Sequence, residues 1–107
     1  RRHLALARWF ADQVDATPGW ERLAPVPLQT VSFRHRPVGL EGSALDAHNL
    51  ALARALNASG RAHLTPAMVK GVQLLRVSVG ATGTTAEDLA ALWSQLREIA
   101  AALPPPR

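Results

Sequence analysis

Cysteine and tyrosine are both missing from this chain, and aromatic residues are scarce. None of the 107 residues is cysteine or tyrosine, and aromatic residues make up only 5%. Without cysteine the chain has no disulfide and no thiolate ligand for a metal ion. Because disulfides are typical of oxidising compartments, this composition fits a cytoplasmic protein, which is the location we expect.

Long apolar runs are missing as well. No run approaches the roughly 18–20 residues of a membrane-spanning helix, and no signal peptide is visible. We therefore expect no membrane partner. The sequence begins with Arg1 rather than methionine, which we interpret as the sign of a piece cut from a longer protein. Its 107 residues provide for one domain, residues 1–107, which would bury roughly two thirds of the unfolded surface.

Acidic residues are outnumbered by basic ones, which raises the question of nucleic-acid binding. The net charge is +4 and the isoelectric point is about 11.4. A nucleic-acid-binding surface gathers basic residues in a stripe with interleaved aromatics. Here the arginines are scattered, and the only lysine is Lys70. We therefore expect no nucleic-acid partner.

The motifs of several common catalytic sites are also absent. The sequence contains no HExxH, no GxSxG and no P-loop. The histidines are His3, His35, His48 and His63. No two of them are four residues apart, as a zinc site on one helix requires, so we expect no metal site. His35 and His63 fall in predicted strands, where we expect structural or surface groups, with a place in a cleft as the alternative.

Two further candidates have a structural interpretation. Lys70, the only possible Schiff-base residue, stands beside Gly71 in a predicted exposed turn. A nucleophilic lysine needs a desolvated or cationic setting, so we interpret Lys70 as a surface charge. Residues 80–83 precede a predicted helix and could offer N–H groups to an anion. They lack the lysine of a P-loop, and we interpret them as a strand-to-helix turn.

Apolar periodicity predicts an alternation of helices and strands. Helices are predicted over residues 1–15, over residues 43–59, and from a capping box near residue 84 to Leu103. Strands are predicted over residues 20–24, 30–36, 61–65 and 72–79. The order α-β-β-α-β-β-α predicts an α+β, two-layer small domain, with helices packed on a mainly antiparallel four-stranded sheet.

Several residues are expected to set the limits of these elements. Ser43 is the predicted N-cap of the second helix, and Gly60 its C-terminal cap. Pro66 is expected to stop the third strand. The last helix has two alternative capping boxes, which are Thr84 with Glu87 and, shifted by one residue, Thr85 with Asp88.

The most informative residue is Arg76, in the middle of the apolar, β-prone run 72–79. Alternation places Arg76 and Leu74 on one face of the strand, and Leu75 and Val77 on the other. Both faces are largely apolar, so we expect this strand inside the fold. A guanidinium keeps its proton, and an unpaired buried charge is very costly. Arg76 should therefore meet either an internal carboxylate or one supplied by a ligand.

The internal alternative is an ion pair with an acidic residue of the chain. The candidates are Asp12, Asp15, Glu21, Glu41, Asp46, Glu87, Asp88 and Glu98. The planar, two-pronged donor geometry of arginine suits a carboxylate in either case. From the residues alone, both alternatives stay open.

A series of short segments along the chain resembles one known family. The segments are Leu4-Ala5-Leu6-Ala7-Arg8, Val31-Ser32-Phe33-Arg34, Leu56-Asn57-Ala58-Ser59-Gly60, His63-Leu64-Thr65, Leu75-Arg76-Val77-Ser78-Val79-Gly80 and Thr84-Thr85-Ala86-Glu87-Asp88-Leu89, followed by Trp93. In order and spacing they resemble the C-terminal domain of the group II pyridoxal-phosphate-dependent decarboxylases, the family of aromatic-L-amino-acid and glutamate decarboxylases. The resemblance covers nearly the whole chain, although no single segment is decisive.

The resemblance implies a fold-type-I lyase whose homodimer has active sites at its interface. A large domain of the same chain would hold pyridoxal phosphate and its lysine, which Lys70 does not match. This domain would complete the active-site cleft and the dimer for an amino-acid substrate. Alone it should bind no cofactor and be inactive, with no catalytic residue of its own. The arginine that matches Arg76 lies near the active site in related enzymes, which makes Arg76 the candidate for the substrate carboxylate.

One departure and two alternatives accompany this interpretation. Where the family often has asparagine after the strand, this chain has Ala81, which puts the shape of that turn in doubt. Nothing is carried over for the loop 37–42. The first alternative is a free-standing α+β module that binds an amino acid or organic anion through Arg76. The second is a purely structural dimerisation piece. The resemblance leaves the choice among aromatic, acidic and diamino substrates open.

Overall fold

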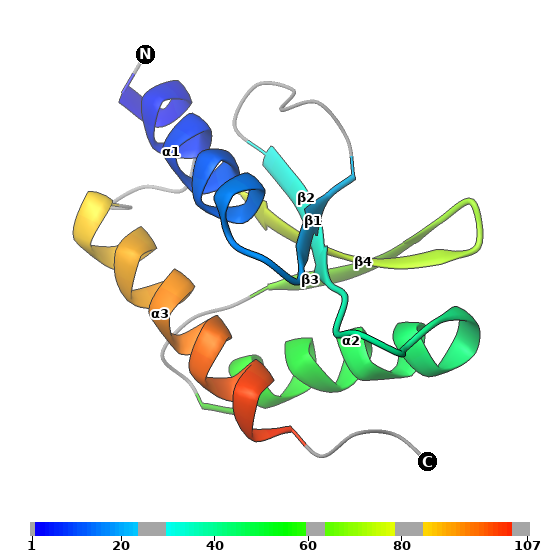
Figure 1. Cartoon of the computed structure of the whole chain (residues 1–107). Coiled ribbons are helices and arrows are strands. Elements are labelled where there is room, and N and C mark those ends of the chain that lie inside the picture. Colours follow the sequence, from blue (N-terminus) through cyan, green and yellow to red (C-terminus); the bar gives the residue numbers. More distant parts are fainter. Residues whose placement is uncertain (1, 24–29, 60–63, 79–84, 104–107) are drawn as a thin grey trace.

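Helices and strands alternate in the predicted order (Figure 1). The computed structural model describes residues 2–23, 30–59, 64–78 and 85–103. Its elements are α1 (Arg2–Ala16), β1 (Trp20–Arg22), β2 (Thr30–His35), α2 (Gly42–Ala58), β3 (Thr65–Val69), β4 (Val72–Ser78) and α3 (Ala86–Ala102). No described helix has the length and apolar character needed to cross a membrane.

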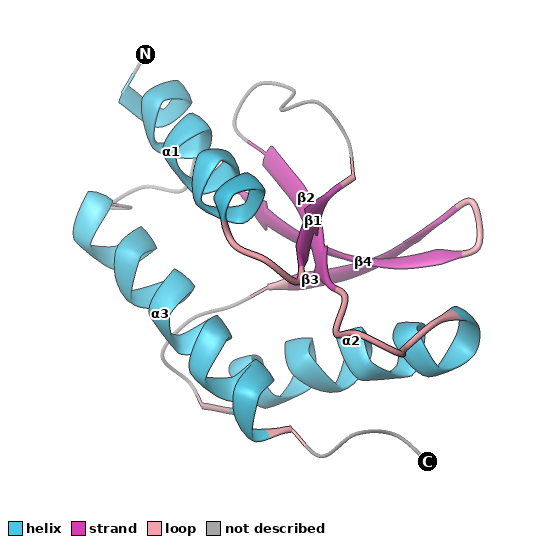
Figure 2. Ribbon diagram, viewed as in Figure 1, coloured by secondary structure: helices cyan, strands magenta, loops and turns pink. Residues whose placement is uncertain are grey.

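The strands form a single antiparallel sheet in the order β1-β2-β4-β3. The predicted α+β two-layer class is therefore confirmed, and every described strand pair is antiparallel. The helices lie together along one side of the strands (Figure 2). Helix α1 packs against β1 and β2, and α2 packs against β4 and β3. The strand β4 is central, as its apolar sequence predicts.

The core lies between the helices and the inward face of the sheet. Val31 and Phe33 are fully buried, and their register partners on β4 are Val77 and Leu75. The Phe10 ring of α1 meets Phe33 edge-on, with ring centroids 5.3 Å apart. Burial of such side chains contributes about 1.5–3 kcal/mol each. These contacts fix which face of the sheet the helices cover.

The start of α2 differs from the prediction. The helix begins at Gly42, and its N-cap is Glu41, which makes no side-chain capping bond. Ser43 was the predicted N-cap and lies inside the helix instead. The Leu45 amide donates to the Glu41 carbonyl, which moves the first turn toward the N-terminus. The C-terminal cap position belongs to Ser59, and Gly60 lies outside the described residues.

The start of α3 follows the shifted alternative rather than the first one. Thr85 Oγ1 accepts from the Asp88 amide at 3.0 Å, and Asp88 Oδ2 accepts from the Thr85 amide at 3.2 Å. This reciprocal pair satisfies two amides that the first turn leaves without helical partners. The box that pairs Thr84 with Glu87 is therefore wrong by one residue.

The third strand was also placed too early. The prediction ended it at Pro66, but β3 runs from Thr65 to Val69 with Pro66 inside it. Because β3 is an edge strand, the missing amide of proline can be tolerated there. Residues 61–63 of the predicted strand lie outside the described residues. Lys70 and Gly71 form the turn to β4 with φ values of +52° and +79°.

Candidate functional site

Arg76 lies on the face of the sheet that is turned away from the helices. Its neighbours Leu75 and Val77 both belong to the core, and successive side chains of a strand point to opposite faces. Across the sheet Arg76 stands opposite Ser32 on β2 and Thr65 on β3. The residue is half-buried. It therefore occupies the middle of the sheet face that no described helix covers.

The internal ion pair that the sequence left open is not formed in the described part of the chain. All eight candidate acids lie within that part. Its ion pairs join Arg22 to Asp15, and both Arg34 and Arg36 to Glu21. None of them includes Arg76. Contact of Arg76 with a ligand carboxylate stays a prediction.

A second polar group shares the open face with Arg76. Arg34 Nε lies 2.8 Å from Glu21 Oε1, and Arg36 Nη1 lies 3.1 Å from Glu21 Oε2. The hydrogen bond from Arg34 is the main reason why the pKa of Glu21 lies below its usual value, and Arg36 acts in the same direction. Only 15% of the Arg34 side chain is exposed. The face that carries Arg76 thus has two further arginines, Arg34 and Arg36, which share the single carboxylate of Glu21.

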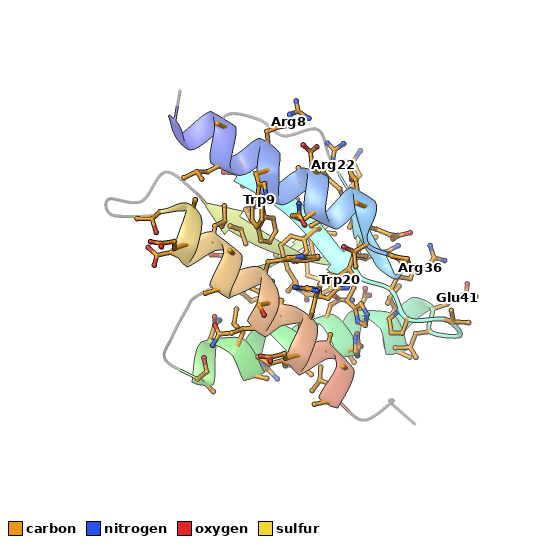
Figure 3. The ribbon with its side chains drawn as sticks, turned by 60° about the vertical axis from the view of Figure 1, so that its left-hand side comes forward. Arg8, Trp9, Trp20, Arg22, Arg36 and Glu41 are labelled. Carbon is orange, nitrogen blue, oxygen red and sulfur yellow. The ribbon has the colours of Figure 1, made fainter. Side chains whose placement is uncertain are left out.

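Two histidines that the sequence analysis treated separately meet where the sheet packs against α2. His35 Nδ1, at the end of β2, lies 2.8 Å from His48 Nε2 on α2. Trp20 packs on the His35 ring with centroids 4.5 Å apart, and Figure 3 shows Trp20 between the strands and α3. Sequence reasoning missed this pair because its members are 13 residues apart on different elements. No group of three potential metal ligands occurs among the described residues.

The histidine pair borders a small cavity of about 150 Å³. Its lining residues are His35, Pro37, Val38, Leu40, His48, Ala100 and Leu103. Burial, helped by the neighbouring His48, lowers the pKa of His35 to about 4. Burial also lowers the pKa of His48. Both imidazoles are therefore neutral near pH 7, and the loop 37–42 forms one wall of the cavity.

Two asparagines of α2 hold the backbone of neighbouring segments. Asn49 Oδ1 accepts from the His35 amide at 2.8 Å, and its Nδ2 donates to the His35 carbonyl at 2.9 Å. Asn57 repeats this arrangement with the amide and carbonyl of Leu64, at 2.7 and 2.9 Å. The two asparagines position the end of β2 and the approach to β3 relative to α2.

The remaining candidates from the sequence analysis are Lys70, the turn 80–83, His63 and His3. Lys70 is exposed on the hairpin turn, as predicted. Residues 80–83, including Ala81, lie outside the described residues. The same is true of His63, whereas the side chain of His3 is not described.

The chain is similar to several decarboxylases over nearly its whole length. It is 32% identical over 99 residues to a tryptophan decarboxylase of Camptotheca acuminata, covering 92% of this chain and 20% of that protein. It is 34% identical to a phenylacetaldehyde synthase of a Rosa hybrid cultivar, covering 96% of this chain and 22% of that protein. No family model matches.

The fold is shared with solved structures. The crystal structure of Oryza sativa TDC with PLP and tryptamine superimposes with a TM-score of 0.89 at 25% identity, over 94% of this chain and 22% of that one. The chain thus spans about a fifth of the length of the relatives it matches. The resemblance seen in the sequence is confirmed: this chain is similar in sequence and in fold to one domain-sized part of the group II pyridoxal-phosphate-dependent decarboxylases.

Proposed function

We propose that this chain is the C-terminal small domain, residues 1–107, of a pyridoxal-phosphate-dependent amino-acid decarboxylase. The observation that carries the proposal is the similarity over more than nine tenths of the chain to about a fifth of enzymes named decarboxylases. In this proposal the larger remainder of the protein supplies the cofactor and the reacting groups. This domain completes the active-site cleft and the homodimer, which works in the cytoplasm.

The residues of this chain do not fit a covalent site for pyridoxal phosphate. Such a site needs a lysine whose pKa is lowered by desolvation or by a neighbouring cation. The single lysine, Lys70, is exposed on a two-residue turn at the edge of the sheet. We therefore assign no step of the reaction to the cofactor within this chain.

The open sheet face is the surface we assign to the rest of the enzyme. It carries Arg76, the Arg34–Glu21 pair and the apolar side chains of Leu74 and Leu23. Leu23 is 38% exposed, and Leu74 lies outside the core cluster that the helices form. A half-buried arginine with the uncharged Ser32 and Thr65 as its cross-strand neighbours, and with no acidic partner among the described residues, suits an anion brought by a second surface. We propose that this anion is the carboxylate of the substrate.

The test compares variants of the full-length enzyme. We expect Arg76→Gln to lower kcat/KM for amino-acid decarboxylation at least about tenfold, because a charge-assisted hydrogen bond contributes about 1.5–3 kcal/mol. Arg76→Lys should recover only part of the loss, since lysine lacks the two-pronged geometry. The matched control is Arg54→Gln, which removes an exposed arginine of α2.

The outcomes separate two parts of the proposal. Release of CO₂ together with an amine supports the decarboxylase itself, and an enzyme that releases no CO₂ from any amino acid contradicts it. If Arg76→Gln behaves like Arg54→Gln in an active enzyme, the assignment of Arg76 to the substrate carboxylate is wrong while the domain assignment stands.

A further inference from the structure

The contact between His35 and His48 is a hydrogen bond between two neutral rings. The nitrogens are 2.8 Å apart and the ring centroids 5.0 Å apart. One nitrogen must donate and the other accept, so the contact holds one shared proton. Two imidazoles on a tetrahedral zinc ion, with Zn–N bonds of about 2.0–2.1 Å, would hold their nitrogens about 3.3 Å apart. The observed geometry is that of a hydrogen bond and not of a metal site.

The described groups packed around the pair provide no counter-ion for an added proton. Strand β1 contributes the Trp20 ring, α3 contributes Ala100, and the C-cap of α3 is Leu103. The loop contributes Pro37 and Leu40. The nearest charges along the chain are Arg34 and Arg36, which are both paired with Glu21, and Asp46, whose carboxylate accepts from the Gln73 amide. A positive charge on the pair would therefore sit among apolar side chains, which disfavours it.

The pair closes a loop whose middle residues have few other ties. His35 ends β2, and His48 lies in the first half of α2, so that the loop 36–41 is closed between them. Other described side-chain links are the bonding of Asn49 to the backbone of His35, the Asp46 carboxylate that accepts from the Gln73 amide of β4, and the ion pair of Arg36 with Glu21. Val38, at the tip of the loop, is fully exposed. Within the loop the Leu40 amide donates to the Pro37 carbonyl, and residues 37–40 make no hydrogen bond to another described element, so loss of the histidine contact would leave the loop held at its two ends.

We propose that the His35–His48 pair is a proton-operated latch that holds the loop 36–41 closed against α2 at neutral pH and releases it in acid. A first added proton places a charge in the apolar site. A second proton makes both facing nitrogens donors, so the contact can no longer be a hydrogen bond. In the open state both rings regain water and their ordinary basicity, so protons bind more tightly there and shift the equilibrium toward opening. The proposal does not depend on the decarboxylase assignment.

The experiment is hydrogen exchange followed by mass spectrometry on the full-length protein at pH 7 and pH 5, corrected for the intrinsic effect of pH on exchange. We expect the protection of peptides within 36–50 to fall about tenfold or more at pH 5, because two imidazoles gain protons on opening. Peptides within α3 are the internal reference and should change little. Exchange at the carbon between the ring nitrogens, measured on the same samples, reports the protonation of each histidine.

Two variants and one control make the result specific. His48→Gln keeps a side-chain amide that can donate to His35 but cannot titrate, so it should reduce the pH effect to the part that His35 contributes. His48→Leu should lower the protection at both pH values. His3→Gln removes an imidazole outside the pair and should behave like the wild type. The latch is refuted if wild-type protection of 36–50 does not change with pH, or if His48→Gln shows the same fall as the wild type.

Discussion

At the scale of residues, the polar groups of α2 decide how the neighbouring segments are held. Asn49 is fully buried and bonds both backbone groups of His35 and the Leu45 carbonyl. A buried amide or carbonyl that loses its partner costs about 1–3 kcal/mol. The buried side chain of Asn49 is therefore required to satisfy the backbone groups at the end of β2.

Replacing Asn49 tests this requirement. We expect Asn49→Ala to lower the free energy of unfolding by about 2–4 kcal/mol, because it leaves the His35 amide and carbonyl without partners. Asn57→Ala, at the half-buried copy of the same arrangement, should cost less. Denaturant unfolding measures both, with the exposed Arg54→Ala as the neutral reference. Equal, small effects at Asn49 and Arg54 would show that the Asn49 bonds do not stabilise the fold.

The histidine pair predicts a pH dependence of stability with a definite sign. The pKa of His35 is about 4 in the folded chain, against an ordinary value of 6.5. Between these values the unfolded state binds more protons than the folded state. The contribution of His35 to the free energy of unfolding is therefore fully present above pH 6.5 and is lost as the pH falls toward 4. His48 acts in the same direction. The slope should reach at most about 1.4 kcal/mol per pH unit for each ring.

Unfolding in denaturant at pH values from 5 to 7 measures this slope while most carboxylates stay ionised. The variant with both His35→Gln and His48→Gln should be less sensitive to pH than the wild type over this range. A wild-type stability that rises as the pH falls would have the opposite sign and would contradict the burial of neutral imidazoles.

The sequence predicted single residues better than it predicted their partners. Alternation placed Arg76 on the face opposite Leu75. Nothing in the spacing showed that Asn49 would bond the backbone of His35, or that His48 would reach its ring. Such contacts depend on the angle between a helix and a strand, which the local pattern does not encode.

At the scale of elements, the start of α3 is defined by the capping box of Thr85 and Asp88. Thr85→Ala should lower the free energy of unfolding by about 1 kcal/mol, because the Asp88 amide loses its acceptor. Thr85→Ser keeps the hydroxyl and should restore most of the stability. Thermal unfolding distinguishes the two variants. If alanine and serine are equivalent at this position, the Thr85 side chain does not cap the helix.

The turn between β3 and β4 allows a stabilising change. Lys70 has φ +52°, a conformation that costs most residues energy but suits asparagine. Lys70→Asn should therefore raise the free energy of unfolding by about 0.5–1 kcal/mol and leave the activity of the full enzyme unchanged. Unfolding and CO₂ release measure the two effects. Loss of activity in this variant would give Lys70 a role in the reaction that its exposure does not support.

Element type was predictable, whereas element limits were not. Periodicity gave every helix and strand in order, because each buries one apolar face. The limits at Ser43, Thr84 and Pro66 were wrong because each depends on tertiary context. The edge position of β3 admits Pro66. Two neighbouring threonines fit a capping box equally well in the sequence, and the structure uses Thr85.

At the scale of the whole molecule, the helices cover one face of the sheet and leave the other to a second surface. The open face holds Arg76 near two further arginines, and the described part of the chain supplies only Glu21 to balance them there. The chain also spans only about a fifth of its relatives. Both observations support a domain that functions as part of a larger enzyme, which composition and periodicity alone could not show.

The central claim is that this domain serves a pyridoxal-phosphate enzyme whose cofactor is held elsewhere in the protein. The most direct measurement is borohydride reduction of the active full-length protein, followed by peptide mapping of the lysine that carries the cofactor. We predict that the modified lysine lies outside residues 1–107 and that Lys70 is unmodified. Cofactor fixed on Lys70, or a full-length protein that retains no pyridoxal phosphate, would contradict the account.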